Sequence, residues 1–279
     1  SVQGLNRFSD QDDRVWLWRD GYLRVDALDI GDAATLDKTQ QVKTKPGFFN
    51  SDGLTVDQHF ATSKDGTKIP YFVQRRTDMK FDGSTPTLVD AYGGFEISMT
   101  PHYSAGVGIG WLERGGCKVI ANVRGGGEYG PSWHQAALKE KRYKAYEDVE
   151  AVTADVIKRG ISSTEKLAVI GGSNGGLMVG NMITRPVASS LFGAAVCQVP
   201  LLDMKRYSHL LAGASWMAEY GDPDTDEWSF LRQHSPYQLL RHDRLGIAED
   251  GEDRVADDSW TCPKVLFTTS TRDDRVHPG

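Results

Sequence analysis

A glycine-rich turn between a buried strand and a helix, residues 165–183, restricts the fold more than any other stretch of this sequence. The run "EKLAVI" is short and apolar, as expected for a buried strand, and "LMVGNMI" follows the turn with the character of a helix. The glycines of "GGSNGG" predict a sharp turn at which strand and helix approach too closely for a Cβ atom. A strand followed at once by a helix is the repeating unit of parallel α/β sheets.

Predicted strands and helices continue through most of the chain. Residues 55–76 form two alternating runs about a "KDG" turn, which predicts an antiparallel pair. Residues 144–160 have the pattern of an amphipathic helix that ends at a glycine. Further buried strands are expected in four short apolar runs, "TPTLVDAY", "GCKVIANV", "FGAAVCQVPL" and "PKVLFTTST". We therefore expect an α/β fold, with a mostly parallel sheet flanked by helices and the functional side chains at the carboxyl ends of its strands.

Residues 1–54 differ from this pattern and are expected to form a separate segment before a domain at 55–279. Residues 14–30 alternate apolar and polar side chains about a "DG" turn, which predicts a hairpin. A long polar connection is expected over residues 31–53. Residues 239–260 are dense in charge without an apolar period, and we expect a solvated loop or insertion there.

Composition excludes several classes of function. A net charge of −6 gives no general attraction to nucleic acid or to an anionic membrane. The three cysteines lie far apart and indicate neither a disulfide framework nor a metal site. No run reaches the roughly 18 apolar residues of a membrane span. We expect no cofactor or metal, no membrane partner and a cytoplasmic location, with the periplasm left open because the chain does not begin with Met.

The turn also suggests chemistry, because Gly171–Gly175 satisfies G-x-S-x-G between a strand and a helix. Ser173 is therefore a candidate nucleophile, and the alternative is a polar residue in a flexible loop. A serine nucleophile needs a base, an acid and donors for an oxyanion. Asp273 and Asp274 follow a strand later in the chain and are candidates for the acid.

A base is harder to find. His277 lies only four residues after Asp273, which is too near for the usual geometry. The other histidines precede the acid, and we expect structural or surface roles for them: His59, His102, His134, His209, His234 and His242.

Eight blocks in this order resemble the prolyl oligopeptidase family of serine peptidases: "SKDGTKIPYFV", "AYGGFEISMTPHYS", "ANVRGGGEYGPSWHQA", "GGSNGGLMVG", "VPLLDMKRY", "EYGDP", "SPY" and "TRDDRVHPG". The resemblance covers almost all of residues 55–279. It implies an α/β-hydrolase catalytic domain, with residues 1–54 as the remnant of a β-propeller. It also implies cleavage of short peptides after proline through an acyl-enzyme on Ser173, without a cofactor.

The resemblance assigns roles to particular residues. Ser173 would be the nucleophile, Asp273 the acid with Asp274 as runner-up, and the Tyr92 hydroxyl and the Asn174 backbone N–H the oxyanion donors. Phe95, Trp216 and Val276 would line an apolar pocket with Tyr220 beside it, and Arg275 would bind a substrate carbonyl. The alternatives are core packing for the aromatic residues and a surface ion pair for Arg275. Residues 124–130 are interpreted as a glycine-rich loop beside the site rather than a phosphate loop.

The sequence departs from the family pattern at its end. The family's histidine lies beyond another helix and strand, whereas this sequence stops six residues after Asp273. A truncated chain, a partner that supplies the missing element and a divergent enzyme all fit this ending. The hypotheses are therefore a prolyl peptidase, a carboxylesterase acting on small acyl esters, and an inactive fragment or interaction module. The expected partners are short peptides or small esters, and the oligomeric state is open.

Overall fold

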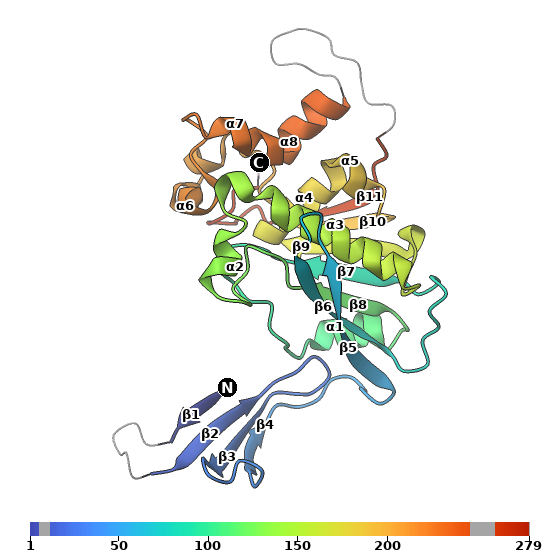
Figure 1. Ribbon diagram of the computed structural model, residues 1–279, viewed down its shortest axis with the longest axis vertical. Helices are drawn as coiled ribbons and strands as arrows, with labels where there is room; N and C mark the ends of the chain where they lie inside the picture. Colours follow the sequence, from blue (N-terminus) through green and yellow to red (C-terminus); the bar gives the residue numbers. More distant parts are fainter. Residues whose placement is uncertain (6–11, 246–259, 279) are drawn as a thin grey trace. The chain divides into compact units, whose positions relative to one another are not determined.

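The computed structural model describes residues 1–5, 12–245 and 260–278. It divides into two compact units (Figure 1). The first unit comprises Ser1–Val56, Gln74–Asp78 and Thr100–Gly116, and the second comprises Asp57–Val73, Met79–Met99 and Cys117–Gly279. The proposed origin of residues 1–54 in a propeller stays a prediction.

The first unit contains a four-stranded antiparallel sheet in the order β1-β2-β3-β4. The expected hairpin is present, since Val15 lies opposite Gly31 and Trp18 opposite Leu28. The strands of this sheet are β1 (Val2–Gly4), β2 (Arg14–Arg19), β3 (Ala27–Asp32) and β4 (Gln40–Thr44).

Strand β4 corrects one expectation from the sequence. It lies inside residues 31–53, which we expected to be a polar connection without a strand, and it pairs with β3. All five of its residues are exposed, so it carries no alternation of buried and exposed side chains. Its place in the sheet rests on backbone hydrogen bonds, which leave no pattern in the sequence.

A seven-stranded sheet follows, in the order β11-β10-β9-β7-β8-β6-β5. Neighbours from β8 through β7, β9 and β10 to β11 pair in parallel, as the sequence predicted. Strands β5 and β6 form a hairpin closed by a 2.8 Å hydrogen bond from Ser63 N–H to the Thr67 carbonyl. The strands are β5 (Leu54–Thr62), β6 (Lys68–Arg76), β7 (Thr87–Ala91), β8 (Cys117–Ala121), β9 (Leu167–Gly172), β10 (Ala194–Gln198) and β11 (Lys264–Thr268).

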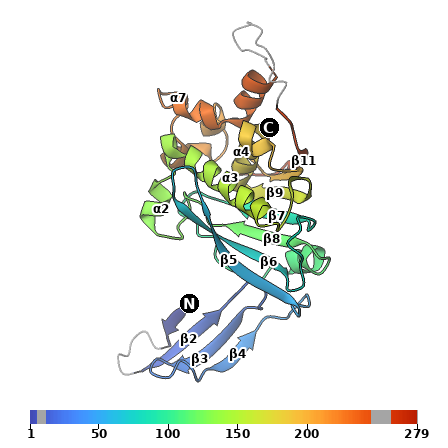
Figure 2. The same ribbon diagram turned by 45° about the vertical axis from the view of Figure 1, so that its right-hand side comes forward.

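Two long helices pack against this sheet. Helix α3 (Tyr143–Lys158) buries the apolar side of its amphipathic pattern and is followed by Gly160 at φ 70°, the glycine expected at its end. Helix α4 (Asn174–Thr184) is buried at every residue and contacts β9 and β10, with α3 beside it (Figure 2). The short helices are α1 (Ala105–Val107), α2 (Pro131–Gln135), α5 (Pro186–Ser189), α6 (Met217–Tyr220), α7 (Trp228–Leu231) and α8 (Pro236–Gln238). The π-helical turns are Gly108–Leu112 and Leu239–Arg244, and the 3₁₀ turns are Lys139–Lys141, Thr164–Lys166, Tyr207–His209, Gly213–Trp216 and Arg232–His234.

The charged segment at residues 239–260 differs in part from the expected loop. Its first residues, Leu239–Arg244, form a π-helical turn that continues from α8. At its other end the Trp260 indole N–H donates to the Ile183 carbonyl at 2.9 Å, so this side chain packs on the domain. Residues 246–259 lie outside the described residues.

Candidate active site

Ser173 occupies the strained turn between β9 and α4. Its backbone has φ 57° and ψ −117°, a conformation that a residue with a Cβ atom rarely adopts. Its N–H donates to the Gln198 carbonyl of the neighbouring strand at 3.0 Å. A Cβ atom on Gly171 would lie 2.4 Å from the Gly175 carbonyl oxygen, and one on Gly176 would lie 2.7 Å from that of Gln198. The glycines therefore permit the close approach of strand and helix that the sequence predicted.

Three of the sequence-predicted residues lie at one edge of the parallel sheet. Tyr92 directly follows β7, Ser173 directly follows β9, and Asp273 lies five residues beyond the end of β11. These strands run in the same direction, and Gly172 is in register with Gln198, which is in register with Thr268. The carboxyl ends of parallel strands meet at one edge, which is where α/β proteins place their sites.

The Tyr92 phenol lies close to the Ser173 side chain and is half-buried. Burial raises its pKa, while a hydrogen bond with the Ser173 side chain acts in the opposite direction. The net shift is upward, so the phenol keeps its proton at neutral pH and can donate it. Asn174 is the first residue of α4, and the first N–H groups of a helix have no carbonyl partner within it. Both predicted oxyanion donors thus border the serine.

Asp273 is held as a carboxylate by its own loop. Its Oδ1 accepts from the Val276 N–H at 2.8 Å and from the Arg275 N–H at 2.9 Å. These two bonds, that of Val276 first, lower the pKa of the carboxyl. Asp274 and Arg275 are exposed. The positive charge of Arg275 offsets part of the upward shift of the Tyr92 pKa.

The predicted pocket residues come together from three parts of the chain. The rings of Phe95 and Tyr220 pack edge to face with centroids 5.5 Å apart. Trp216 packs against the same cluster, which includes buried Val276. Tyr220 is only 2% exposed, and its hydroxyl donates to Asn174 Oδ1 at 2.9 Å. Tyr220 is therefore packed in the core, where its ring contacts Phe95 and its hydroxyl contacts Asn174.

A cavity of about 360 Å³ opens beside this cluster. Trp216 and Val276 line it together with Leu210, Pro200 and His277, whereas Ser173, Phe95 and Tyr220 are not among its lining residues. Trp216 and Val276 thus border the cavity, whereas Phe95 and Tyr220 lie next to the serine turn.

The histidines that the structure describes hold varied positions. His134 Nε2 lies 2.7 Å from Glu219 Oε2, and His209 Nε2 lies 2.6 Å from Asp224 Oδ2. His234 is buried, which lowers its pKa to about 3. His277 is exposed at the cavity, and the side chain of His242 lies outside the described residues.

The glycine-rich loop at residues 124–130 packs backbone to backbone on the segment that follows Tyr92. The Glu96 N–H donates to the Gly125 carbonyl at 3.2 Å. A Cβ atom on Gly125 would lie 2.3 Å from the Gly93 carbonyl oxygen, and one on Gly127 would lie 2.2 Å from that of Glu96. The loop is therefore a support for the Tyr92 segment.

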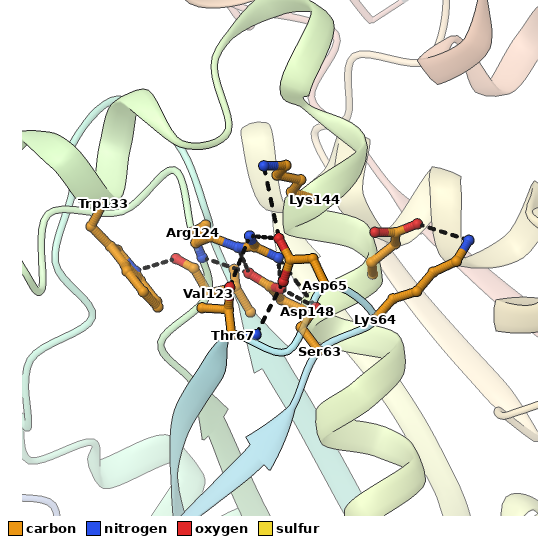
Figure 3. A network of polar contacts seen from close by, with 10 residues as sticks. Ser63, Lys64, Asp65, Thr67, Val123, Arg124, Trp133, Lys144 and Asp148 are labelled. Atoms are coloured by element: carbon orange, nitrogen blue, oxygen red, sulfur yellow. Dashed lines mark hydrogen bonds and ion pairs between the residues drawn. The ribbon is translucent and has the colours of Figure 1, made fainter.

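A buried ion network anchors this loop at its start (Figure 3). The Arg124 guanidinium donates to Asp148 through Nε at 2.9 Å and Nη2 at 2.7 Å, and the Arg124 backbone N–H donates to the same carboxylate at 3.0 Å. Asp148 also accepts from the Ser63 hydroxyl at 2.6 Å, and Arg124 reaches Asp65 at 2.5 Å. Asp148 belongs to α3 and Asp65 to the β5–β6 turn. The network therefore joins these two elements to the start of the glycine-rich loop.

Sequence reasoning missed two buried residues next to the serine, Arg142 and Glu219. Arg142 Nη1 donates to Glu219 Oε1 at 2.7 Å, and Arg142 Nη2 also donates to Asn174 Oδ1. Glu219 directly precedes Tyr220 in the "EYGDP" block, which was the available signal, whereas the sequence around Arg142 is charged and carries none.

Among residues 1–5, 12–245 and 260–278, no cluster of His, Cys, Asp and Glu could hold a metal ion. No helix in that part of the chain is both long and apolar enough to span a bilayer.

Comparison with known proteins gives consistent matches. Residues 102–279 match the prolyl oligopeptidase family. The chain is 45% identical over 280 residues to an uncharacterized peptidase of Sinorhizobium fredii, covering 100% of the chain and 36% of the relative. It is 37% identical over 234 residues to a prolyl endopeptidase of Elizabethkingia miricola, covering 82% of the chain and 30% of the relative.

Solved structures agree with these matches. A post-proline cleaving enzyme from Rickettsia typhi superimposes with a TM-score of 0.83 at 35% identity, covering 100% of this chain and 37% of that one. Apo prolyl oligopeptidase B from Galerina marginata gives a TM-score of 0.82 at 28% identity, covering 100% and 37%. The chain thus spans about a third of the length of its relatives. The shared α/β-hydrolase architecture and the match over residues 102–279 show that this chain belongs to the prolyl oligopeptidase family.

Proposed function

We propose that this chain carries the nucleophile, the acid and the oxyanion donors of a serine peptidase that cleaves short peptides after proline. The observation that carries the proposal is the strained backbone of Ser173, at φ 57° and ψ −117°, at the end of a strand that pairs in parallel with the strand before Tyr92. Such strain persists where the surrounding structure enforces it, and it clusters at functional sites.

In the proposed reaction Ser173 Oγ attacks the carbonyl carbon of the scissile bond. The negative charge that develops on the carbonyl oxygen is stabilised by the Tyr92 hydroxyl and the Asn174 backbone N–H. Proton transfer to the leaving amine releases the first product and leaves an acyl group on the serine, which water then hydrolyses.

A base must take the serine proton, and Asp273 would orient that base. We assign this role to none of the histidines in the present sequence. The resemblance to the family implies a histidine, and the chain spans about a third of its relatives' length. We therefore propose that a histidine elsewhere in the whole protein completes the triad.

Preference for proline is proposed from the apolar cavity beside the cluster. Trp216 offers a flat face on which a pyrrolidine ring can stack, and Val276 lies beside it. Arg275 is exposed on the same loop and would donate to a carbonyl of the substrate. The relatives whose names specify prolyl endopeptidase or post-proline cleavage support this substrate class.

The first experiment is labelling with a fluorophosphonate probe followed by mass spectrometry. We expect modification of the whole protein at Ser173 that is absent in Ser173→Ala, and an unlabelled whole protein would refute a competent nucleophile and favour the inactive module. The second experiment compares kcat/KM for an amide cleaved after proline and for a p-nitrophenyl acyl ester. Turnover of the ester alone would overturn the peptidase assignment in favour of a carboxylesterase.

A further inference from the structure

The Arg142–Glu219 pair is a buried ion pair directly behind the serine turn. The two side chains are 3% and 5% exposed, and their Nη1 and Oε1 atoms are 2.7 Å apart. Removing two such charges from water is costly, and well-packed apolar residues often stabilise a core as well or better. A gain in stability is therefore a weak explanation for the burial of these two charges. Their contacts indicate a different role.

The pair first fixes the side chain of Asn174, the residue after the candidate nucleophile. Asn174 Oδ1 accepts from Arg142 Nη2 and from the Tyr220 hydroxyl, the latter at 2.9 Å. Asn174 Nδ2 donates to the Tyr92 carbonyl at 2.5 Å. Both ends of the carboxamide are thus engaged, which connects the first residue of α4 to the segment that carries the Tyr92 phenol.

The pair also holds that segment from its other end. Glu219 Oε1 accepts from the Phe95 N–H at 3.0 Å. Phe95 and Glu96 both have φ 56°, a left-handed conformation that is strained for a residue with a Cβ atom. A Cβ atom on Gly94 would lie 2.6 Å from Asn174 Nδ2, so the segment is pressed against Asn174. The Glu219 carboxylate is therefore a fixed acceptor that offsets the strain of residues 95 and 96.

We propose that Arg142 and Glu219 are positioning residues for the oxyanion site. Glu219 fixes residues 92–96, and Arg142 fixes Asn174, so the charged pair sets the separation between the Tyr92 hydroxyl and the Asn174 backbone N–H. Neither residue needs to touch the substrate. This inference rests on the proposed function, because it assigns a purpose to the arrangement only if an oxyanion forms there.

A misplacement of about 1 Å in a catalytic arrangement can lower a rate about 100-fold. The test is therefore the kinetics of fluorophosphonate labelling of the whole protein with and without Glu219→Gln, a substitution that keeps the shape of the side chain and removes its charge. We expect the first-order inactivation rate constant at saturating probe to fall at least about 10-fold, with the half-saturating probe concentration unchanged. A merely structural role would lower the labelled fraction of the sample and leave that rate constant intact.

Glu227→Gln is the matched control. Glu227 accepts from Lys139 Nζ at 2.8 Å and from the Asp222 N–H at 2.7 Å, but it is 33% exposed and makes no contact with residues 92–96 or Asn174. We expect wild-type labelling kinetics in this variant. If Glu219→Gln does not fold, Arg142→Lys replaces it, since lysine keeps the charge but cannot reach Glu219 and Asn174 with two forked N–H groups.

Hydrogen exchange separates failure of this inference from failure of the proposed function, because it needs no activity. We expect faster exchange in peptides covering residues 92–97 and 173–177 of Glu219→Gln, and no change in Glu227→Gln. If the wild-type chain is not labelled but exchange rises as expected, the proposed function fails and the positioning contact stands. Wild-type labelling kinetics together with wild-type exchange in Glu219→Gln would overturn the inference.

Discussion

Mild acid should destabilise the folded chain through one buried imidazole, that of His234. This side chain is 5% exposed, and its burial, together with the charges of Arg185 and Arg142, lowers its pKa to about 3. An unfolded histidine titrates near pKa 6.5. Between these two values the unfolded state binds a proton that the folded state does not, so the free energy of unfolding falls as the pH falls.

The size of this effect follows from the proton balance. Each pH unit between the two pKa values lowers the free energy of unfolding by up to about 1.4 kcal/mol. From pH 6.5 to pH 5 the expected loss is about 2 kcal/mol from this one residue. The loss is complete only near the folded pKa of about 3, where carboxyl groups titrate as well.

Urea unfolding at pH 7, 6 and 5 measures this loss, and His234→Gln isolates it. The two proteins share all other titrating groups, so their difference in stability should shrink by about 2 kcal/mol between pH 7 and pH 5. His209→Gln is the control for loss of an exposed imidazole, because that side chain is 64% exposed. Parallel curves for the wild type and His234→Gln would show that His234 is not held neutral by burial.

Three further changes test other parts of the structure. Asp148→Ala leaves its guanidinium partner charged in the core and should lower the free energy of unfolding by about 3–5 kcal/mol in urea titration; exposed Asp224→Ala should change it by less than about 0.5 kcal/mol. Gly171→Ala places a Cβ atom 2.4 Å from a carbonyl oxygen and should lower the melting temperature, whereas Gly172→Ala meets nothing closer than 3.7 Å and should not; equal melting temperatures would contradict the close approach. Tyr92→Phe removes the hydroxyl that we propose as an oxyanion donor and should lower kcat of the whole protein about 100- to 1,000-fold on any substrate found, with the fold unchanged by circular dichroism.

The strands and helices of the parallel sheet could be predicted because their signals are local. Buried runs such as "KLAVI" and the amphipathic pattern of residues 144–160 reflect burial that persists over many residues. Strand β4 could not be predicted, because its residues are all exposed and it is specified by backbone pairing with β3. The charged segment after residue 239 was similarly ambiguous, since its start is helical.

The sequence by itself determined the serine turn. Glycines at 171, 175 and 176 are needed because strand and helix approach too closely for a Cβ atom there, and this pattern around a serine can be recognised without a fold. The family blocks also identified Tyr92 and Asp273 as candidates, but they did not show which contacts position these two side chains.

Only the tertiary structure decided what supports that turn. Arg142 and Glu219 are 77 residues apart, and Arg142 and Asn174 are 32 apart, so no local pattern connects them. These two charges require partners only once the chain buries them. A glutamate in water is solvated, whereas Glu219 is 5% exposed, and a buried carboxylate is costly unless it is paired and hydrogen-bonded. Local chemistry therefore specified the backbone of the Ser173 turn, and long-range burial specified the ion pair that contacts Phe95 and Asn174 beside it.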